Sequence, residues 1–316
     1  MEQPVQASVV IPTKDRPDDL RRAIASALSQ SVPIELLIMD DGSGAATADM
    51  VRRDFPAVRL VQSGQSLGPS VQRNRGAALA VAPILFPIDD DSCFSTPEVV
   101  AQTLAEFDDP RVGAVAIPVI HVHRGADVTQ RAPATTNRFA TYAFIGAAHA
   151  VRRDLYLKLG GYREELWYYG EESDFCIRML QAGYVVRLGR ADPIHHYESL
   201  RRDWARMEFY GKRNLVLFAW HNVPWPYFPV HLGTSLAKGA WHSLRCGRPW
   251  HSLTGLVHGL GMCVWSPASR RPVSGCVYRL FRRLKKRGAV PFDELEPELP
   301  PLTPAREPAG AAGLKP

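Results

Sequence analysis

The sequence predicts an α/β protein in which a mostly parallel sheet carries helices on both faces. From Ser8 to about Val122, short apolar and β-branched runs alternate with amphipathic stretches, a pattern typical of strand–helix–strand units. The chain has 316 residues and is 46% hydrophobic, so it can bury one large core or two smaller ones. We therefore expect a globular protein.

Five runs are predicted to be strands, and the stretches between them to be helices. The strands are Ser8–Ile11, Ile34–Met39, Val58–Val61, Ile84–Ile88 and Val112–Val119, and the helices are Arg16–Ser29, Ala45–Phe55, Ser70–Ala80 and Pro97–Phe107. Residues 123–145 are polar and irregular, and we expect a loop over the site there. A helix from about Glu172 to Ala182 and a strand over Tyr184–Leu188 follow.

Three consecutive carboxylates, Asp89, Asp90 and Asp91, follow the apolar run Ile84–Ile88. This places them at the carboxyl end of a buried strand, where open α/β sheets bind their ligands. Like charges this close raise one another's pKa, and a divalent cation among them would relieve the repulsion. A solvated acidic turn explains the triplet alone equally well.

Residues 201–290 are strongly basic. They carry 16 Lys and Arg against Asp203 and Glu208, a net charge of +14, together with six of the seven tryptophans. This composition is typical of a surface that meets anionic lipid headgroups, whereas no nucleic-acid-binding motif is present. The uncharged intervals between Arg213 and Lys238 and between Arg248 and Arg270 are interrupted by proline, glycine or histidine. They favour amphipathic helices that are interfacial or re-entrant over spanning ones.

The chain is therefore expected to have three regions. Residues 1–200 form the nucleotide-binding and catalytic domain, 201–290 a membrane-associating helical region, and 291–316 a proline-rich, disordered tail. Five widely spaced cysteines without a CxxC pair indicate reduced thiols and no zinc site. The start of the chain has no secretory signal pattern, so we expect a cytoplasmic protein, peripheral on the inner face of the cell membrane.

Five motifs occur in order along the first two thirds of the chain. They are Val9–Pro17, the turn Met39–Ser43, Gln72–Gly76, the acidic triplet, and Gly160–Arg163 followed by Gly170–Asp174. Each is weak alone, but their order and spacing are specific. Over roughly residues 7–200 the chain resembles the family 2 (GT2) glycosyltransferases of the bacterial polysaccharide type, which implies the Rossmann-like GT-A fold.

The resemblance implies roles for the acidic residues. Asp89 and Asp91 match the DxD signature that holds Mg²⁺ or Mn²⁺, with Asp91 as the first ligand and Asp89 as the second. His196, preferred over His195, would complete the metal site. The nucleotide-sugar site would comprise Pro12, Thr13, Asp15, Asp41, Arg73, Asp89 and Asp90. Among these, Asp41 would accept a hydrogen bond from the base of the nucleotide.

Glu171-Glu172 stands where the family typically carries Glu-Asp. Glu172 aligns with the aspartate that deprotonates the acceptor hydroxyl. Because the side chain of Glu172 is longer than that of the aspartate and must reach the same hydroxyl, Glu171 remains the alternative catalytic base. An acidic first turn favoured by the helix dipole would also explain the pair.

The resemblance thus implies a metal-dependent, inverting glycosyltransferase. It would move a sugar from a nucleotide-diphosphate donor, UDP or dTDP, to a hydroxyl of a glycan or lipid-linked acceptor. Two alternatives remain open: a catalytically inactive relative that acts as a membrane assembly subunit, and a sugar-phosphate nucleotidylyltransferase. The second would need a glycine- and lysine-rich loop after the first strand, which Thr13–Arg16 is not.

Overall fold

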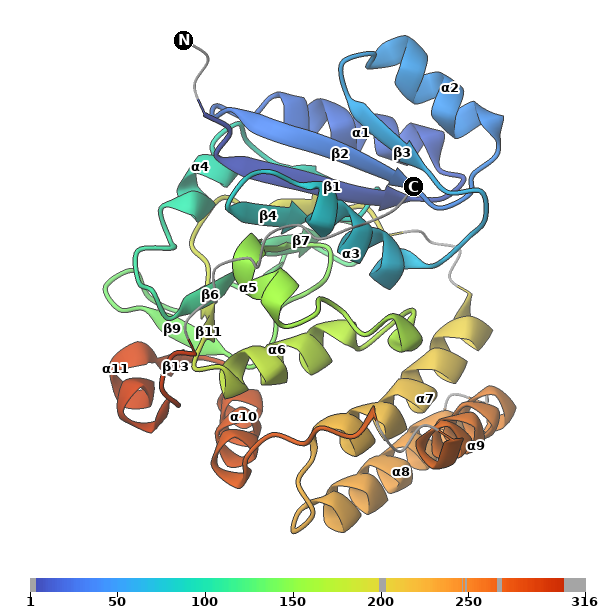
Figure 1. Cartoon of the computed structure of the whole chain (residues 1–316), viewed down its shortest axis with the longest axis vertical. Helices are drawn as coiled ribbons and strands as arrows, with labels where there is room; N and C mark the ends of the chain where they lie inside the picture. The colour runs from blue at the N-terminus through green and yellow to red at the C-terminus, as the bar shows by residue number, and fades with distance from the viewer. Residues whose placement is uncertain (1–3, 199–202, 246, 248, 266–268, 304–316) are drawn as a thin grey trace, which may run out of the picture.

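The computed structural model describes residues 4–198, 203–245, 247, 249–265 and 269–303. At its centre lies a nine-stranded sheet in the order β13-β9-β11-β6-β10-β4-β1-β2-β3 (Figure 1). Its strands are β1 Ala7–Thr13, β2 Ile34–Asp40, β3 Arg59–Gln62, β4 Ile84–Pro87, β6 Val112–Ala116, β9 Phe139–Thr141, β10 His149–Arg152, β11 Val185–Leu188 and β13 Val290–Pro291. Only β9 and β10 run against the others. The predicted α/β class and mostly parallel sheet are therefore confirmed.

Helices cover both faces of this sheet. They are α1 Pro17–Leu28, α2 Ala45–Asp54, α3 Pro69–Leu79, α4 Val99–Leu104, α5 Arg153–Lys158 and α6 Glu171–Gln181. Val9 and Ile11 of β1 belong to the cluster that α1, α2 and α4 cover, whereas Val10 belongs to the cluster under α3, α5 and α6. This alternation follows from the two-residue period of a strand.

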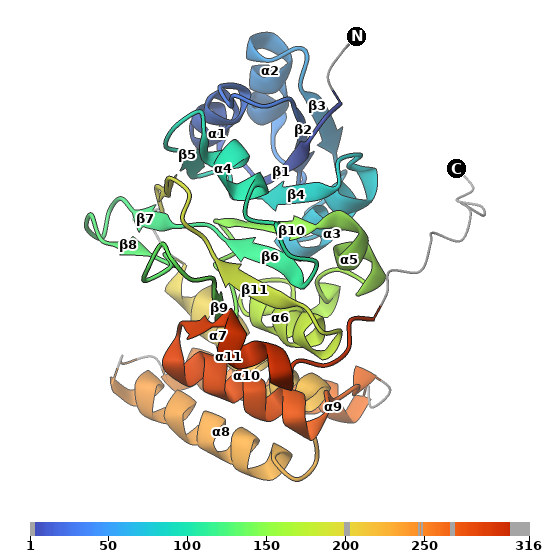
Figure 2. The same ribbon diagram turned by 90° about the vertical axis from the view of Figure 1, so that its left-hand side faces the viewer.

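A second sheet, in the order β5-β12-β7-β8, stands beside the first (Figure 2). It consists of β5 Ser92–Phe94, β7 Val119–His121, β8 Val128–Thr129 and β12 Ile194–His196. The predicted strand Val112–Val119 is in fact two strands, β6 and β7, that belong to different sheets. The predicted loop 123–145 is also wrong in part, because β8 and β9 lie within it. Strands of two or three residues are too short to show a period in the sequence.

The C-terminal part forms the helices α7 Trp204–Asn222, α8 Phe228–Arg245, α9 Pro249–Trp265, α10 Gly275–Arg287 and α11 Phe292–Leu295, followed by the 3₁₀ turn Glu296–Glu298. Helices α7, α8 and α9 lie together at the end of the molecule opposite α2 (Figures 1 and 2). No helix in the described ranges is long and apolar enough to cross a membrane.

The predicted disorder from Pro291 onward is wrong for residues 291–303. Strand β13 extends the central sheet by pairing with β9, and Val290 and Leu295 are fully buried beside α10. The remainder of the predicted tail, residues 304–316, lies outside the described residues.

Candidate functional site

The acidic triplet links the two sheets. It follows β4 directly and leads into β5, whose pairing with β12 sets His196 opposite Ser92. As a result, Asp91 Oδ1 lies 3.1 Å from His196 Nε2. One ligand atom from each of Asp89, Asp91 and His196 falls within 4.8 Å of the others. The structure therefore brings together the three predicted metal ligands, although they are far apart in the sequence.

These residues fit a divalent cation. Apart from its ion pair with His196, the buried Asp91 Oδ1 has no hydrogen-bond donor in the described part of the chain, and a metal bound by both groups would replace that ion pair. Two carboxylates and an imidazole form a donor set that Mn²⁺ accepts readily, and Mg²⁺ uses one or two carboxylates together with substrate phosphates. Burial opposes protonation of His196, but Asp91 and Asp89 outweigh it and raise the pKa of the imidazole.

Arginines also neutralise the triplet. Arg16 Nη1 lies 3.2 Å from Asp90 Oδ1 and 2.9 Å from Asp91 Oδ2, and Arg73 forms an ion pair with Asp89. The triplet is thus not explained by a metal alone. Arg16 was not among the predicted site residues. Its position just after β1, beside the carboxyl end of the parallel strand β4, is the signal that could have found it.

The carboxylate of Asp90 is directed at Thr13 and Arg16. Its Oδ2 accepts a hydrogen bond of 2.8 Å from Thr13 Oγ1, and its Oδ1 accepts one from Arg16. Burial raises the pKa of Asp90 to about 7, against the opposing effects of Arg16 and Thr13. The predicted residues Thr13 and Asp90 therefore contact each other and support the wall of the site.

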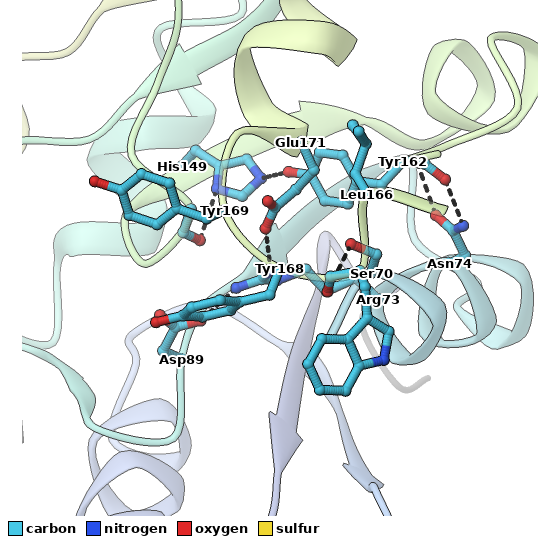
Figure 3. A network of polar contacts seen from close by, with 12 residues as sticks. Ser70, Arg73, Asn74, Asp89, His149, Tyr162, Leu166, Tyr168, Tyr169 and Glu171 are labelled. Atoms are coloured by element: carbon cyan, nitrogen blue, oxygen red, sulfur yellow. Dashed lines mark hydrogen bonds and ion pairs between the residues drawn. The ribbon is translucent and has the colours of Figure 1, made fainter. Parts of the chain in front are cut away.

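Arg73 of α3 joins the triplet to the predicted catalytic pair. The buried guanidinium contacts Asp89, and its Nη1 lies 3.2 Å from Glu171 Oε1 (Figure 3). The acidic first turn of α6 consequently faces the carboxyl edge of the sheet. Because Glu171 is engaged with Arg73, its carboxylate is partly neutralised.

Glu172 is half-buried beside Gly146, where an added Cβ would come within 2.6 Å of Glu172 Oε1. Burial, and then the charge of Glu171, raise the pKa of Glu172 to about 8. Burial also raises the pKa of Glu171, although Arg73 opposes this. A carboxylate with a raised pKa suits proton abstraction near neutral pH, and the pairing of Glu171 leaves Glu172 better placed for it.

A buried histidine supports this region and was missed from the sequence. His149 stacks on Phe144, and its Nδ1 lies 3.1 Å from Gly146 O. Its Nε2 lies 3.1 Å from Tyr162 Oη (Figure 3). Burial lowers the pKa of His149 to about 3, so the ring is neutral and serves to hold Gly146. No sequence motif marks such a packing role.

Asp41 and Asp15 lie at the carboxyl ends of β2 and β1, on the same sheet edge as the triplet. The Asp41 carboxylate accepts hydrogen bonds from Ser66 Oγ, Gln72 Nε2 and the backbone N–H groups of residues 67 and 68. Burial raises its pKa, but these bonds outweigh burial and lower it. Asp15, with a φ of 54°, accepts a bond of 2.8 Å from Gly44 N. Both side chains shape loops at this edge, and Pro12 lies within β1, opposite Met39.

Helix α6 is held by a buried carboxylate. Asp174 accepts hydrogen bonds from Arg163 Nε at 3.1 Å, Arg178 Nε at 2.9 Å and Asn222 Nδ2 at 2.7 Å. Arg178 thus braces Asp174 within the same helix. The third donor lies on α7, so the C-terminal helices fix the orientation of α6.

Comparison with known proteins agrees with this arrangement. The sequence model named Glycosyl transferase family 2 matches residues 8–164. The Pre-mycofactocin glycosyltransferase of Mycobacterium tuberculosis is 28% identical over 229 residues. That match covers 65% of this chain but only 46% of the relative, so the chain spans about half of the relative's length.

Solved structures show the same fold. A mannosyltransferase from Pyrobaculum calidifontis, in complex with GDP-Man and Mn²⁺, has a TM-score of 0.57 at 20% identity; the match covers 88% of this chain and 79% of that one. TarS of S. aureus, residues 1–349 with UDP-GlcNAc, has a TM-score of 0.54 at 16% identity, covering 73% and 72%. At these identities the likeness shows the GT-A fold.

Proposed function

Because residues 8–164 belong to glycosyl transferase family 2, we propose that the protein is a metal-dependent, inverting glycosyltransferase. It moves a sugar from a UDP- or dTDP-linked donor to a hydroxyl of a glycan or lipid-linked acceptor. One observation carries the proposal: a potential metal site and a pair of glutamates, of which Glu171 is buried and Glu172 half-buried, meet at one sheet edge and are joined through Arg73.

Each group has a task in this reaction. Asp89, Asp91 and His196 would hold Mg²⁺ or Mn²⁺, which stabilises the negative charge that develops on the departing diphosphate. Glu172 accepts the proton of the acceptor hydroxyl, whose oxygen bonds to the sugar C1 while the bond from C1 to the diphosphate breaks. A single displacement of this kind inverts the anomeric configuration. Arg73 contacts both Glu171 and Asp89, and so fixes the position of the glutamate pair relative to the metal ligands.

The relatives support a transferase more than the alternatives. The two structural neighbours carry GDP-Man with Mn²⁺ and UDP-GlcNAc, and the mycobacterial relative is named for glycosyl transfer. A nucleotidylyltransferase would need a pyrophosphate loop that this chain lacks after β1. An inactive assembly subunit would not need a buried ionisable pair beside a metal-ligand set, because such groups destabilise a fold.

A panel of nucleotide sugars tests the proposal. UDP-, dTDP- and GDP-linked sugars are added with Mn²⁺, with Mg²⁺ or with EDTA, and thermal stabilisation and donor hydrolysis are measured. We expect at least one UDP- or dTDP-linked sugar to raise the melting temperature only with metal. Stabilisation that is equal in EDTA would contradict metal-dependent donor binding, and no response to any donor would contradict the proposed function.

We further propose that helices α8 and α9 rest on an anionic membrane surface. Their large apolar side chains point outward, with exposed fractions from 50% to 82%: Val230, Trp241, Leu244, Trp250, Leu253, Val257, Val264 and Trp265. The fully buried positions of the two helices carry small side chains, whereas Leu232, Leu236, Leu256 and Met262 are partly buried against the cluster around Val216 and Leu217. The hydroxyl of the buried Ser252 accepts a hydrogen bond from Ser243 Oγ and donates one of 2.9 Å to Glu208 Oε2. The row of large apolar side chains left exposed on these helices suits a surface that faces lipid.

The positive charge of this region favours anionic lipid as the partner of the exposed face of α8 and α9. Between Glu208 and Asp293 the sequence contains no acidic residue, so the basic side chains of α8, such as Lys238 and Arg245, have no acidic neighbour within that segment. Each basic residue near such a surface contributes about 1 kcal/mol. The polybasic α10 contributes less than its sequence suggests, because Arg283 and Arg287 form ion pairs with Glu298 and Glu294.

Vesicle binding tests this surface with a matched pair of variants. Val257→Asp places a charge on the exposed face of α9, and Val81→Asp places the same charge on an equally exposed valine of the catalytic domain. In sedimentation with vesicles containing phosphatidylserine, Val257→Asp should weaken binding on the order of tenfold or more, and Val81→Asp should not. Equal binding to neutral vesicles, or equal loss in both variants, would refute the proposed surface.

A further inference from the structure

The loop before the catalytic helix has an unusual backbone. Residues 167–170 connect the 3₁₀ turn Glu164–Leu166 to α6. Trp167, Tyr169 and Gly170 have positive φ angles of 56°, 76° and 99°. Aromatic residues rarely adopt such angles, because Cβ collides with the backbone. This conformation therefore requires support from other parts of the molecule.

Two adjacent side chains of α7 provide that support. Asn214 Nδ2 lies 2.7–2.8 Å from the carbonyl oxygens of Leu166, Tyr168 and Tyr169, which share its two N–H donors. Arg213 Nη2 donates to the carbonyl oxygens of Glu165 at 2.6 Å and Leu166 at 2.8 Å. Arg213 Nε also donates to Asn214 Oδ1 at 2.9 Å, which fixes the amide with its NH₂ group toward the loop.

The burial of Arg213 shows that this contact is more than simple packing. Arg213 is 6% exposed and Asn214 is 4% exposed, and within the described ranges the guanidinium forms no ion pair with a carboxylate. Burial accordingly lowers its pKa. A buried cation that faces carbonyl groups and the Tyr210 ring, without a carboxylate partner, costs stability that an apolar side chain would not. We therefore attribute the burial of Arg213 to the loop conformation that its hydrogen bonds stabilise.

Helix α7 is itself held firmly. A Cβ on Gly255 of α9 would collide with the Phe209 carbonyl oxygen, so the two helices are in close backbone contact. Further along α7, Asn222 donates to Asp174 of α6, and His221 Nε2 lies 3.1 Å from Glu165 Oε1. The donors therefore project from a support that is fixed to α9 on one side and to α6 on the other.

We propose that Arg213 and Asn214 are positioning residues that clamp the 165–169 backbone and thereby set where α6 begins. Glu171 and Glu172 are the first two residues of that helix, so a clamped loop holds Glu171 against Arg73 and Glu172 beside Gly146. The clamp comes from α7, outside the part of the chain that the family model matches. This inference rests on the proposed function, because it assigns the clamp to the glutamates of that reaction.

The test compares two substitutions on the same helix. Asn214→Ala removes the donor to the loop, and Val216→Ala shortens an equally buried side chain of α7 that instead faces Gly259 of α9. Both variants should lower the melting temperature by a few degrees. Only Asn214→Ala should speed hydrogen exchange of the peptide containing residues 164–174. It should also lower kcat for transfer from the active donor, on the order of 10- to 100-fold, with donor KM and UDP affinity in Mn²⁺ within about twofold.

The outcomes separate this inference from the proposed function. If the wild type turns over no donor, the proposed function fails, and the exchange measurement still decides whether the clamp exists. Unchanged exchange in Asn214→Ala would refute the clamp. Equal loss of kcat in both variants would show that Asn214 contributes only to stability and does not position the glutamates. Arg213→Lys, which keeps the charge but loses the forked geometry, should resemble Asn214→Ala in both measurements.

Discussion

Replacing Glu172 with Gln should abolish most of the turnover and leave donor binding intact. The substitution keeps the size of the side chain and removes its ability to take a proton. A positioned general base contributes about 10²–10⁴-fold to rate, which corresponds to about 2.7–5.5 kcal/mol of the activation barrier. Glu171→Gln should be milder, because Glu171 is engaged with Arg73 and contributes through that contact.

The pH dependence should identify the same group. With a pKa of about 8, only about a tenth of Glu172 is ionised at pH 7. In the wild type, kcat/KM should therefore rise about tenfold per pH unit below pH 8 and level off above it, whereas the Gln variant should be flat. The free energy of unfolding should change with pH in the opposite direction to kcat/KM. Because the folded pKa exceeds the ordinary 4.5, the wild type loses stability as pH rises from about 4.5 to about 8. Glu172→Gln should lose less, and the loss that remains comes from groups such as Asp90 and Glu171, whose pKa values are also raised.

Single-turnover transfer from the donor found in the nucleotide-sugar panel, measured from pH 5.5 to 9.5, provides the assay. UDP titration in Mn²⁺ is the control for binding. The reasoning is refuted if Glu171→Gln loses more turnover than Glu172→Gln, because the base would then be Glu171. It is also refuted if the Glu172→Gln rate keeps the wild-type dependence on pH.

Two further substitutions probe the other half of the site. Asp91→Ala should remove the metal dependence of UDP binding without unfolding the protein; calorimetry with Mn²⁺ and with EDTA checks this, and undiminished metal-dependent affinity would contradict the assignment. Arg73→Met should leave the Asp89 and Glu171 carboxylates without their shared cation and cost about 3–5 kcal/mol of unfolding free energy. Arg75→Met, on the same helix but half-buried, is the control in urea denaturation, and equal losses would contradict the argument.

The sequence was sufficient to place the acidic residues on one edge of the sheet. Asp15, Asp41 and Asp89 each follow a strand of a strand–helix repeat, and the carboxyl ends of parallel strands meet at the same edge. The strand pattern predicted this edge for the acidic triplet, and the family resemblance assigned Asp15 and Asp41 to the same site. His196 needed more, because its place depends on the pairing of β12 with β5, which a strand of three residues does not reveal.

Contacts across long loops could not be predicted in this way. Asp41 reads as a turn residue, and only the folded chain shows that residues 66–72 wrap its carboxylate. Arg213 and Asn214 lie in a stretch whose charge and tryptophans indicated a membrane surface, yet both side chains are buried against the loop before α6. A composition averaged over 90 residues of the sequence cannot separate the side chains of a helix that face lipid from those that face the site.

The C-terminal segment shows how composition misleads and offers a direct check. Residues 291–303 are rich in proline and glutamate, yet Leu295 is fully buried in a cluster with α10. Leu295→Ala should therefore cost about 2–5 kcal/mol of unfolding free energy, visible as a lower midpoint in urea. Glu296→Ala, at the exposed neighbouring position, should leave the midpoint nearly unchanged. If both variants unfold at the wild-type midpoint, the segment contributes nothing to the core, and disorder from residue 291 would be the better description.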